Sequence, residues 1–354
     1  MQYIKQDFYD KFVCSADKCP DNCCHEGWQI VVDEDSLERF KNYDGPLKKK
    51  IEAGVDFDEG VINFDSEGHC PMLNKDGLCE LVLEMGEESL CTTCHMYPRH
   101  IEEYDGLREL SISISCPLGA KMTIEREEPM GFVEVNDDEP EPLEDDFDDF
   151  DYLLFDRLIE SREKIYNVLK DRNKGILYRI ATVIDYADSL QKCIDDDCIF
   201  DMDDIEPGEE GDFDMHRFIL KHGGFLKSLE RLRQDWNDYL EYLDKVMLLS
   251  PAEFEDEYVQ YVNCFGESVH DRMLENILMS LIFTYYPGAV YDDMLSAKVM
   301  LCVFNAVMID GISFGMYLST KEATVESFET VTYKFAREIE HSDENLNAVE
   351  DYFG

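Results

Sequence analysis

The sequence predicts a mainly α-helical protein of 354 residues that begins with a small cysteine-rich α+β domain. Three observations lead to this prediction. Nine of the thirteen cysteines lie within the first 116 residues, apolar residues recur with a helical period after residue 152, and a strongly acidic segment separates the two regions. We therefore expect a cysteine-rich metal-binding domain over residues 1–128, an acidic linker over 129–151 and a helical-bundle domain over 152–354.

The N-terminal domain is expected to be rich in loops. Residues 28–32 and 60–64 are typical of short strands, and the strict alternation of residues 110–115 predicts a half-buried strand. Residues 33–43 predict a short helix capped by Asp33 or Asp35. A domain this small buries little apolar area, and metal ligation is a usual remedy.

The acidic segment and the region after it differ sharply in pattern. Eleven of the eighteen residues from 134 to 151 are acidic and two are proline, which favours a solvated linker or surface loop. Beyond it, apolar residues recur at threes, fours and sevens. Helices are expected over 153–169, 175–193, 215–248, 251–263, 268–286, 292–318 and 321–341, packed as a bundle.

Charge and hydropathy exclude some classes of partner. With 80 Asp and Glu against 32 Lys and Arg, the formal net charge is −48, so we expect no nucleic-acid partner. The most apolar stretch, residues 295–318, is interrupted by Lys298, Asn305 and Asp310. A membrane-spanning helix needs roughly 20 nearly uncharged residues, so we expect a buried helix and no membrane insertion.

The cysteine usage indicates a reducing compartment. The first ten residues lack the order of basic, apolar and small residues that marks a signal peptide. Many cysteines without an export signal more often hold metal than form disulfides. We therefore expect a cytoplasmic, metal-binding protein.

The cysteine spacing matches no simple zinc finger, which pairs its ligands as C-x2-C or C-x4-C twice over. A zinc site and an iron–sulfur cluster each take four ligands. The thiols therefore allow one cluster with spare structural cysteines, two metal centres, or a cluster plus zinc. Buried reduced thiols, or a redox pair at C-x2-C, are the alternatives. The nine residues are Cys14, Cys19, Cys23, Cys24, Cys70, Cys79, Cys91, Cys94 and Cys116.

Other side chains near the cysteines have two possible roles. His25, His69 and His95 each lie next to a cysteine in sequence and could ligate a metal or support its ligands. Arg99 could offset the negative charge of thiolates or form an ordinary surface ion pair. No Walker loop and no G-x-G-x-x-G after a strand is present. The residues alone therefore indicate an acidic metal-binding protein with a helical domain.

The ordered cysteine motifs add a more specific expectation. The pattern C-x4-C-x3-CC-x3-W at 14–28 is followed by CPxL at 70–73, LC at 78–79, TCxxYPR at 93–99 and SxSCP at 113–117. This set resembles the flagellin lysine-N-methylase family. The resemblance implies a bacterial enzyme that methylates the ε-amino group of flagellin lysines with S-adenosylmethionine and carries an iron–sulfur cluster, for which we expect the 4Fe-4S type with zinc as the alternative metal.

The resemblance also selects candidate ligands. It carries the metal-ligand role to eight positions and ranks Cys91 below them, and it assigns no catalytic base or cofactor pocket. The eight candidates are Cys14, Cys19, Cys23, Cys24, Cys70, Cys79, Cys94 and Cys116.

The expected chemistry limits the role of the metal. A lysine amine has a pKa of about 10.4, so polar methyl transfer needs a deprotonated amine in a desolvated site or a nearby base. The radical arrangement C-x3-C-x2-C fails because Glu26 occupies the third position. We favour a metal that is structural or orients the cofactor. The alternative function is a non-catalytic iron or zinc chelator whose acidic helical domain binds a partner.

Overall fold

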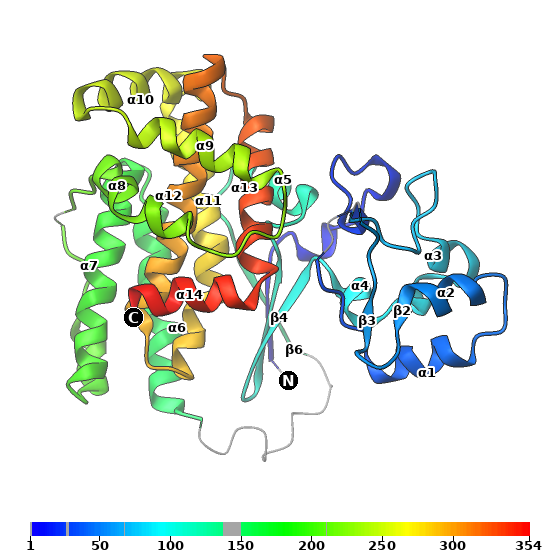
Figure 1. Ribbon diagram of the computed structural model, residues 1–354. Helices are drawn as coiled ribbons and strands as arrows, with labels where there is room; N and C mark the ends of the chain where they lie inside the picture. The colour runs from blue at the N-terminus through cyan, green and yellow to red at the C-terminus, as the bar shows by residue number, and fades with distance from the viewer. Residues whose placement is uncertain (1, 26–27, 67, 137–149, 210) are drawn as a thin grey trace.

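The structure is a computed structural model that describes residues 2–25, 28–66, 68–136, 150–209 and 211–354. Figure 1 shows a small lobe of short helices and loops beside a larger helical lobe, with a sheet on the side of the larger lobe that faces the small one. The architecture is mainly α with an α+β N-terminal region, which confirms the predicted fold class.

The small lobe has its own hydrophobic core, which runs from Ile30 to Cys91 and includes Phe40 and Ile51. The predicted Asp33 cap is confirmed, since its carboxylate accepts from the Ser36 amide at 2.9 Å. The lobe contains helices α1 (Glu34–Asn42), α2 (Lys48–Gly54), α3 (Glu80–Met85) and α4 (Thr92–Met96) and strands β2 (Val55–Asp56) and β3 (Val61–Ile62).

One predicted strand of this lobe is wrong. Within residues 28–32 only Val31 forms a β-bridge, a single isolated one to Val61. The segment still follows β3, because the Ile62 amide donates to the Ile30 carbonyl and the Val32 amide donates to the Gly60 carbonyl. The apolar alternation thus reports burial of Ile30 and Val32 without a regular ladder.

A four-stranded sheet packs with the helical lobe. Its order is β4 (Arg99–Tyr104), β5 (Leu107–Ile112), β1 (Gln2–Gln6) and β6 (Phe132–Asn136), with β1 parallel to β5 and antiparallel to β6. Phe8, Tyr104 and Ile112 share one core with the helices. Strand β6 therefore occupies part of the segment predicted as linker, and residues 137–149 of that segment lie outside the described residues.

The strand predicted at 110–115 is β5, but it ends at Ile112. The chain turns there, because the Cys116 amide donates to the Ser113 carbonyl. Helix α5 (Pro117–Ile124) follows, with proline at its first position where no amide hydrogen is needed.

The larger lobe is built around helix α12 (Leu295–Thr320). Among the described residues it is the one helix long and apolar enough to cross a membrane, and 89% of its most apolar window is buried inside the protein. The expected buried helix is confirmed. Its polar residues have partners: Lys298 pairs with Asp292 and Glu350 at 2.7 Å each, and Asp310 accepts from Tyr258, Tyr261 and His270.

The remaining helices surround α12 (Figure 1). Their bounds agree with the predictions within a few residues, except at 215–248 and at the C-terminal helix after residue 341, which was not predicted from the sequence. They are α6 (Tyr152–Leu169), α7 (Ile176–Asp195), α8 (Met215–Leu226), α9 (Trp236–Met247), α10 (Pro251–Phe265), α11 (Glu267–Tyr285), α13 (Val325–Glu340) and α14 (Asp343–Phe353).

The single helix predicted over 215–248 is wrong, because it is broken into α8 and α9 by residues 227–235. Two side chains from the C-terminal helices hold this loop open. Asn345 accepts from the Glu230 amide at 2.8 Å, and Glu338 accepts from the Leu232 amide at 2.9 Å. These acceptors lie more than a hundred residues away, so the local helical period did not reveal the break.

A buried ion pair joins the sheet to the helices. The Arg162 guanidinium of α6 donates to both carboxylate oxygens of Glu109 on β5, at 2.6 and 2.5 Å, and also to the Phe283 carbonyl. The two side chains are 3% and 1% exposed. Removing one partner from such a pair leaves an uncompensated buried charge.

Arg162→Met should therefore lower the free energy of unfolding by about 3 to 5 kcal/mol, measured by urea denaturation. Glu109→Leu combined with Arg162→Met should restore most of this loss, because no charge is left buried. Lys48→Met, which breaks the exposed pair with Asp44, serves as the control and should change stability by less than about 1 kcal/mol. Equal losses in Arg162→Met and Lys48→Met would contradict this account.

Candidate functional site

The structure gathers six thiols in the small lobe, which we call the thiol cluster. Cys24 hydrogen-bonds with Cys23 and Cys70, and Cys94 hydrogen-bonds with Cys91. The charges of Cys23 and Cys70 also act on the other members. The cluster consists of Cys23, Cys24, Cys70, Cys79, Cys91 and Cys94.

Backbone hydrogen bonds bring these cysteines together from three segments. The Cys70 amide donates to the Cys24 carbonyl at 2.7 Å and joins the first two segments. A tight turn at Asn74, closed by the bridge between Leu73 and Cys79, folds Cys79 back toward Cys70. Cys91 and Cys94 lie at the start of α4, one helical turn apart.

Hydrogen bonds between neighbouring thiols lower the pKa of one partner and raise the pKa of the other. The hydrogen bond from Cys94 lowers the pKa of Cys91 to about 7, and the hydrogen bond with Cys24 lowers the pKa of Cys70. The same contacts raise the pKa of Cys94 and of Cys24. Two thiols are therefore favoured as thiolates, which is the form that ligates metal.

The other candidate ligands lie outside this cluster. Cys19 and Cys116 lie at its edge, where burial raises the pKa of Cys116 to about 11 and the charges of Cys19 and Cys23 add to the rise. Cys14 is exposed, and its Sγ accepts from the Ala16 amide. Cys91, which the sequence placed last, is instead 2% exposed and inside the cluster.

Two of the three histidines that neighbour cysteines in the sequence lie against each other. His25 and His69 face one another with ring centroids 4.8 Å apart, and His69 lies 3.4 Å from Asp65. His95 is exposed.

The thiol cluster fits a metal by its chemistry more than by its geometry. Thiolates are the soft ligands that iron–sulfur clusters and zinc select. Within the described ranges, however, no three His, Cys, Asp or Glu side chains are close enough to hold one ion.

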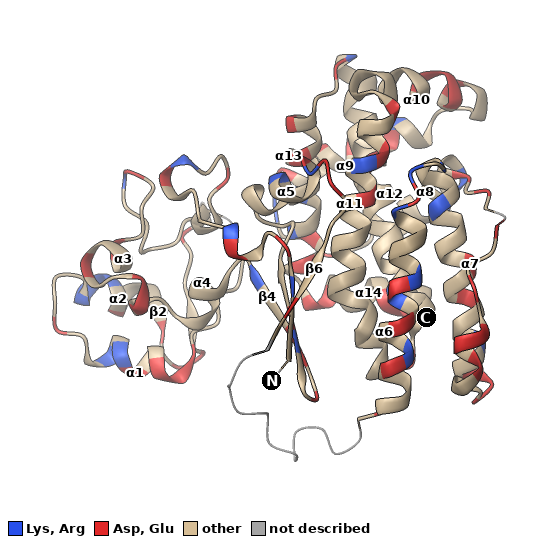
Figure 2. Ribbon diagram, turned by 180° about the vertical axis from the view of Figure 1, so that it is seen from behind, with Lys and Arg blue, Asp and Glu red and all other residues tan. Residues whose placement is uncertain are grey.

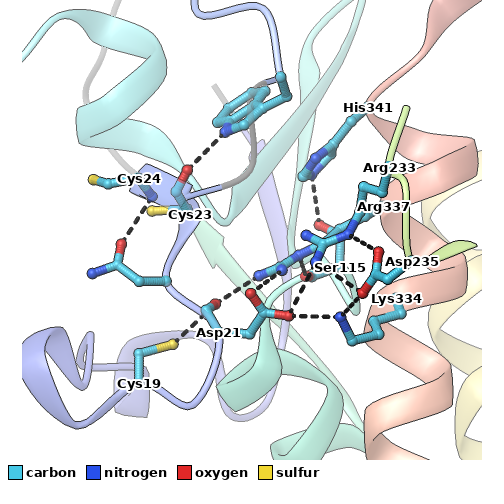
Figure 3. A network of polar contacts seen from close by, with 12 residues as sticks. Cys19, Asp21, Cys23, Cys24, Ser115, Arg233, Asp235, Lys334, Arg337 and His341 are labelled. Atoms are coloured by element: carbon cyan, nitrogen blue, oxygen red, sulfur yellow. Dashed lines mark hydrogen bonds and ion pairs between the residues drawn. The ribbon is translucent and has the colours of Figure 1, made fainter. Parts of the chain in front are cut away.

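A cluster of opposite charges fixes the first cysteine loop to helix α13 (Figure 3). The Asp21 carboxylate lies 3.2 Å from Arg337, 3.1 Å from Lys334 and 3.7 Å from Arg233. Arg337 also donates to the Asp21 carbonyl at 2.9 Å and, through Nε, to the Ser115 carbonyl at 2.8 Å. This loop is therefore held in place by the larger lobe.

The cation next to the thiols is thus one that sequence reasoning missed. Burial raises the pKa of Cys19, and the charge of Arg337 partly opposes that rise. Arg99, the sequence candidate, instead lies over the rings of Tyr9 and Phe12. Arg337 follows Cys19 by more than three hundred residues, and no local signal connects them.

Aromatic side chains complete the contact between the lobes. Trp28 stacks on His341 with centroids 4.7 Å apart, and its Nε1 donates to the Cys23 carbonyl at 3.1 Å. Burial and the charges of Arg337 and Arg233 lower the pKa of His341 to about 3, so this ring is neutral at physiological pH. Figure 3 shows His341 beside Ser115, whose hydroxyl lies 3.1 Å from its Nε2.

Comparison with known proteins identifies a family model and several relatives. A model of the FliB lysine N-methylase C-terminal domain matches residues 162–354. Over 118 residues, 31% of this chain, the sequence is 29% identical to the flagellar biosynthetic protein FliU of Salmonella muenchen and covers 69% of it. It is equally identical to the lysine-N-methylases of Salmonella typhimurium and Salmonella choleraesuis, but spans only 29% of the length of each. No solved structure matches.

The contact between the lobes predicts a specific effect of Arg337→Met. The variant keeps most of the aliphatic stem but loses charged hydrogen bonds to Asp21 and Ser115, each worth about 1.5 to 3 kcal/mol. Amides of residues 19–24 should exchange hydrogen at least about tenfold faster by mass spectrometry, while α1 in the separate small core stays unchanged.

The matched control is Lys18→Met, an exposed cation on the same loop. It should leave the exchange of residues 19–24 at the wild-type rate. If both variants exchange alike, Arg337 does not hold the loop.

Proposed function

Because this chain belongs to the FliB lysine N-methylase family, we propose that it is an S-adenosylmethionine-dependent protein-lysine N-methyltransferase that acts on flagellin. One observation carries the proposal. The part of the chain that matches the family model provides Arg337, Lys334 and His341, and these residues meet Asp21 and Trp28 of the cysteine-rich lobe. These contacts support a single site that combines the family domain with the thiol cluster.

The proposal includes a cysteine-ligated iron–sulfur cluster, with zinc as the alternative metal. The proposed ligands belong to the thiol cluster. Cys19 and Cys116 lie close enough for the charges of Cys19 and Cys23 to raise the pKa of Cys116. Thiolate ligation would neutralise part of the metal charge and further order the three chain segments that carry the thiols. The role assigned to the metal is to shape the lobe against α13. Methyl transfer itself needs only a donor and a neutral amine.

Charge supports a basic protein substrate. The net charge of −48 creates a negative field that increases the encounter rate with lysine-bearing surfaces. Figure 2 shows acidic residues along helices of both lobes. The names of the relatives, lysine-N-methylase and flagellar biosynthetic protein, point to flagellin as that substrate. The thirteen free cysteines support the cytoplasm as the compartment.

The proposal predicts methylation of flagellin that depends on the thiol cluster. Flagellin coexpressed with this protein should gain mass in steps of one methylene, measured by intact mass spectrometry. Cys23→Ser combined with Cys70→Ser should abolish the gain, because both contact partners of Cys24 are lost. Cys264→Ser, an exposed thiol at the end of α10, should leave it intact.

A soluble, metal-loaded protein that adds no mass to flagellin would refute the methyltransferase proposal. The protein would then be better explained as a non-catalytic chelator that binds iron or zinc through the same thiol cluster.

Metal content tests the ligand set separately. Cys91→Ser should lower the iron or zinc bound per purified chain at least about tenfold, because Cys91 is buried within the thiol cluster. Cys14→Ser should change it by less than about twofold, because that thiol is exposed and outside the cluster. Elemental analysis and the visible absorption of iron–sulfur clusters provide the readout. The reverse order would contradict the assignment.

A further inference from the structure

A small polar cleft lies where the sheet meets helices α11 and α13. Its volume is about 20 Å³, and strand β5, the turn after it and the C-terminal end of α13 form its walls. The polar side chains that line it include His100, Ser113, Ser280, Thr284, Tyr285 and Glu340.

Several lining groups carry oxygen atoms, beside the apolar side chains of Ile112, Ile114 and Leu281. The Ser113 hydroxyl donates to the Glu340 carboxylate and lies 2.6 Å from the Ser115 hydroxyl. On the opposite wall, Thr284 donates to the Ser111 hydroxyl at 3.2 Å. Carboxylate and hydroxyl oxygens are acceptors, so the cleft suits a small group with several N–H donors.

The size of the cleft limits what can enter. A volume of about 20 Å³ holds one water-sized group and excludes a nucleoside or a sugar. The terminal amine of a lysine is a compact group with three donors on a slender four-carbon stem. The terminal amine of a lysine therefore matches both the volume and the acceptors, with its carbon stem left outside the cleft.

Glu340 is suited to exchange a proton near neutral pH. Burial raises its pKa to about 7, and the hydrogen bond from Ser113 and the charge of His100 partly oppose that rise. The titratable groups that face it are His100 from β4 and Tyr285 from α11. His100 is itself paired with Glu102 at 2.6 Å.

The cleft is joined to the contact between the lobes. Ser115, which Ser113 contacts, is also in contact with His341, and His341 stacks on Trp28 next to Cys23. An amine in the cleft would lie two hydroxyl groups away from that contact.

We propose that this cleft binds the ε-amino group of the substrate lysine and that Glu340 accepts its proton. This inference rests on the proposed methyltransferase function. It names a substrate position and a catalytic residue that the sequence left unassigned.

Methylation of the bound lysine takes two steps, a proton transfer and a methyl transfer. The Glu340 carboxylate takes a proton from the lysine ammonium, which leaves a neutral amine and a carboxylic acid. The amine nitrogen then forms a bond to the methyl carbon of a sulfonium donor that approaches from outside the cleft, the carbon–sulfur bond breaks, and the electron pair of that bond remains on sulfur. The product is a methylated ammonium and a thioether, and Glu340 returns its proton to water.

A raised carboxyl pKa makes this transfer less costly. A fully ionised carboxylate would hold the lysine as an ammonium by charge attraction. A carboxyl that is partly protonated at neutral pH and lies in a desolvated cleft attracts that charge less and accepts its proton more readily.

Amine binding can be tested without methyl transfer by thermal unfolding in n-butylamine hydrochloride at pH 8, with equal sodium chloride as reference. The wild-type melting temperature should rise by about 2 °C at saturation. Glu340→Gln, which preserves the shape and an acceptor, should lose this rise. Glu338→Gln, on the same helix but outside the cleft lining, should keep it.

Thr284→Leu is a second test variant. The larger side chain fills the cleft from α11, so n-butylamine should no longer raise the melting temperature. Failure of n-butylamine to stabilise the wild type, or equal stabilisation of wild type and Glu340→Gln, would overturn the amine site.

Catalysis is the second readout. Glu340→Gln should lower kcat for flagellin methylation about 100-fold and remove the loss of rate below about pH 7, while Glu338→Gln leaves both unchanged. Equal pH profiles for wild type and Glu340→Gln would overturn the role of Glu340. Amine binding in a wild-type protein that methylates nothing would instead support the cleft and refute the proposed function.

Discussion

The contact of Asp21 with Arg337, Lys334 and Arg233 sets the relation between the two lobes. It fixes the first cysteine loop to the larger lobe, because one carboxylate faces three cations in a partly buried position. Trp28, stacked on His341, and Cys23, whose carbonyl Trp28 binds, take their positions from the same contact. The first cysteine loop is therefore held against helix α13 by charge, and the rings of Trp28, Tyr97 and His341 add aromatic contacts.

The fold class could be predicted from sequence because its signals are local. Helical periodicity located most helices of the larger lobe, and Asp33 marked the start of α1 through a cap that its own neighbour Ser36 satisfies. The errors arose where distant residues decide the outcome. Asn345 and Glu338 break the segment at 227–235, and β1 and β6 pair across more than a hundred residues. No sequence window of helical or strand length contains both partners.

The candidate site was likewise predictable only where its signals are local. The cysteine spacing indicated metal chemistry, and the structure brings five of the eight candidate ligands into the thiol cluster, with Cys19 and Cys116 beside it. The ligand role itself stays a prediction. Cys91 was ranked last by resemblance, although burial and contact with Cys94 place it inside the cluster. Arg337, His341 and Glu340 carry no motif, and only the packing of α13 against the sheet gives them a role.

The chain enters and leaves the small lobe at two neighbouring points. The chain leaves the larger lobe after Phe12 and returns at Arg99, whose guanidinium donates to the Phe12 carbonyl. The described residues from Ile30 to Cys91 form a core separate from that of the larger lobe, so the small lobe has the form of an insertion between these neighbouring points. Such an insertion can unfold locally while its host stays intact. Oxidative damage to the thiols would then produce a folded but incomplete protein, and repair would require rebuilding one appendage instead of refolding the whole chain.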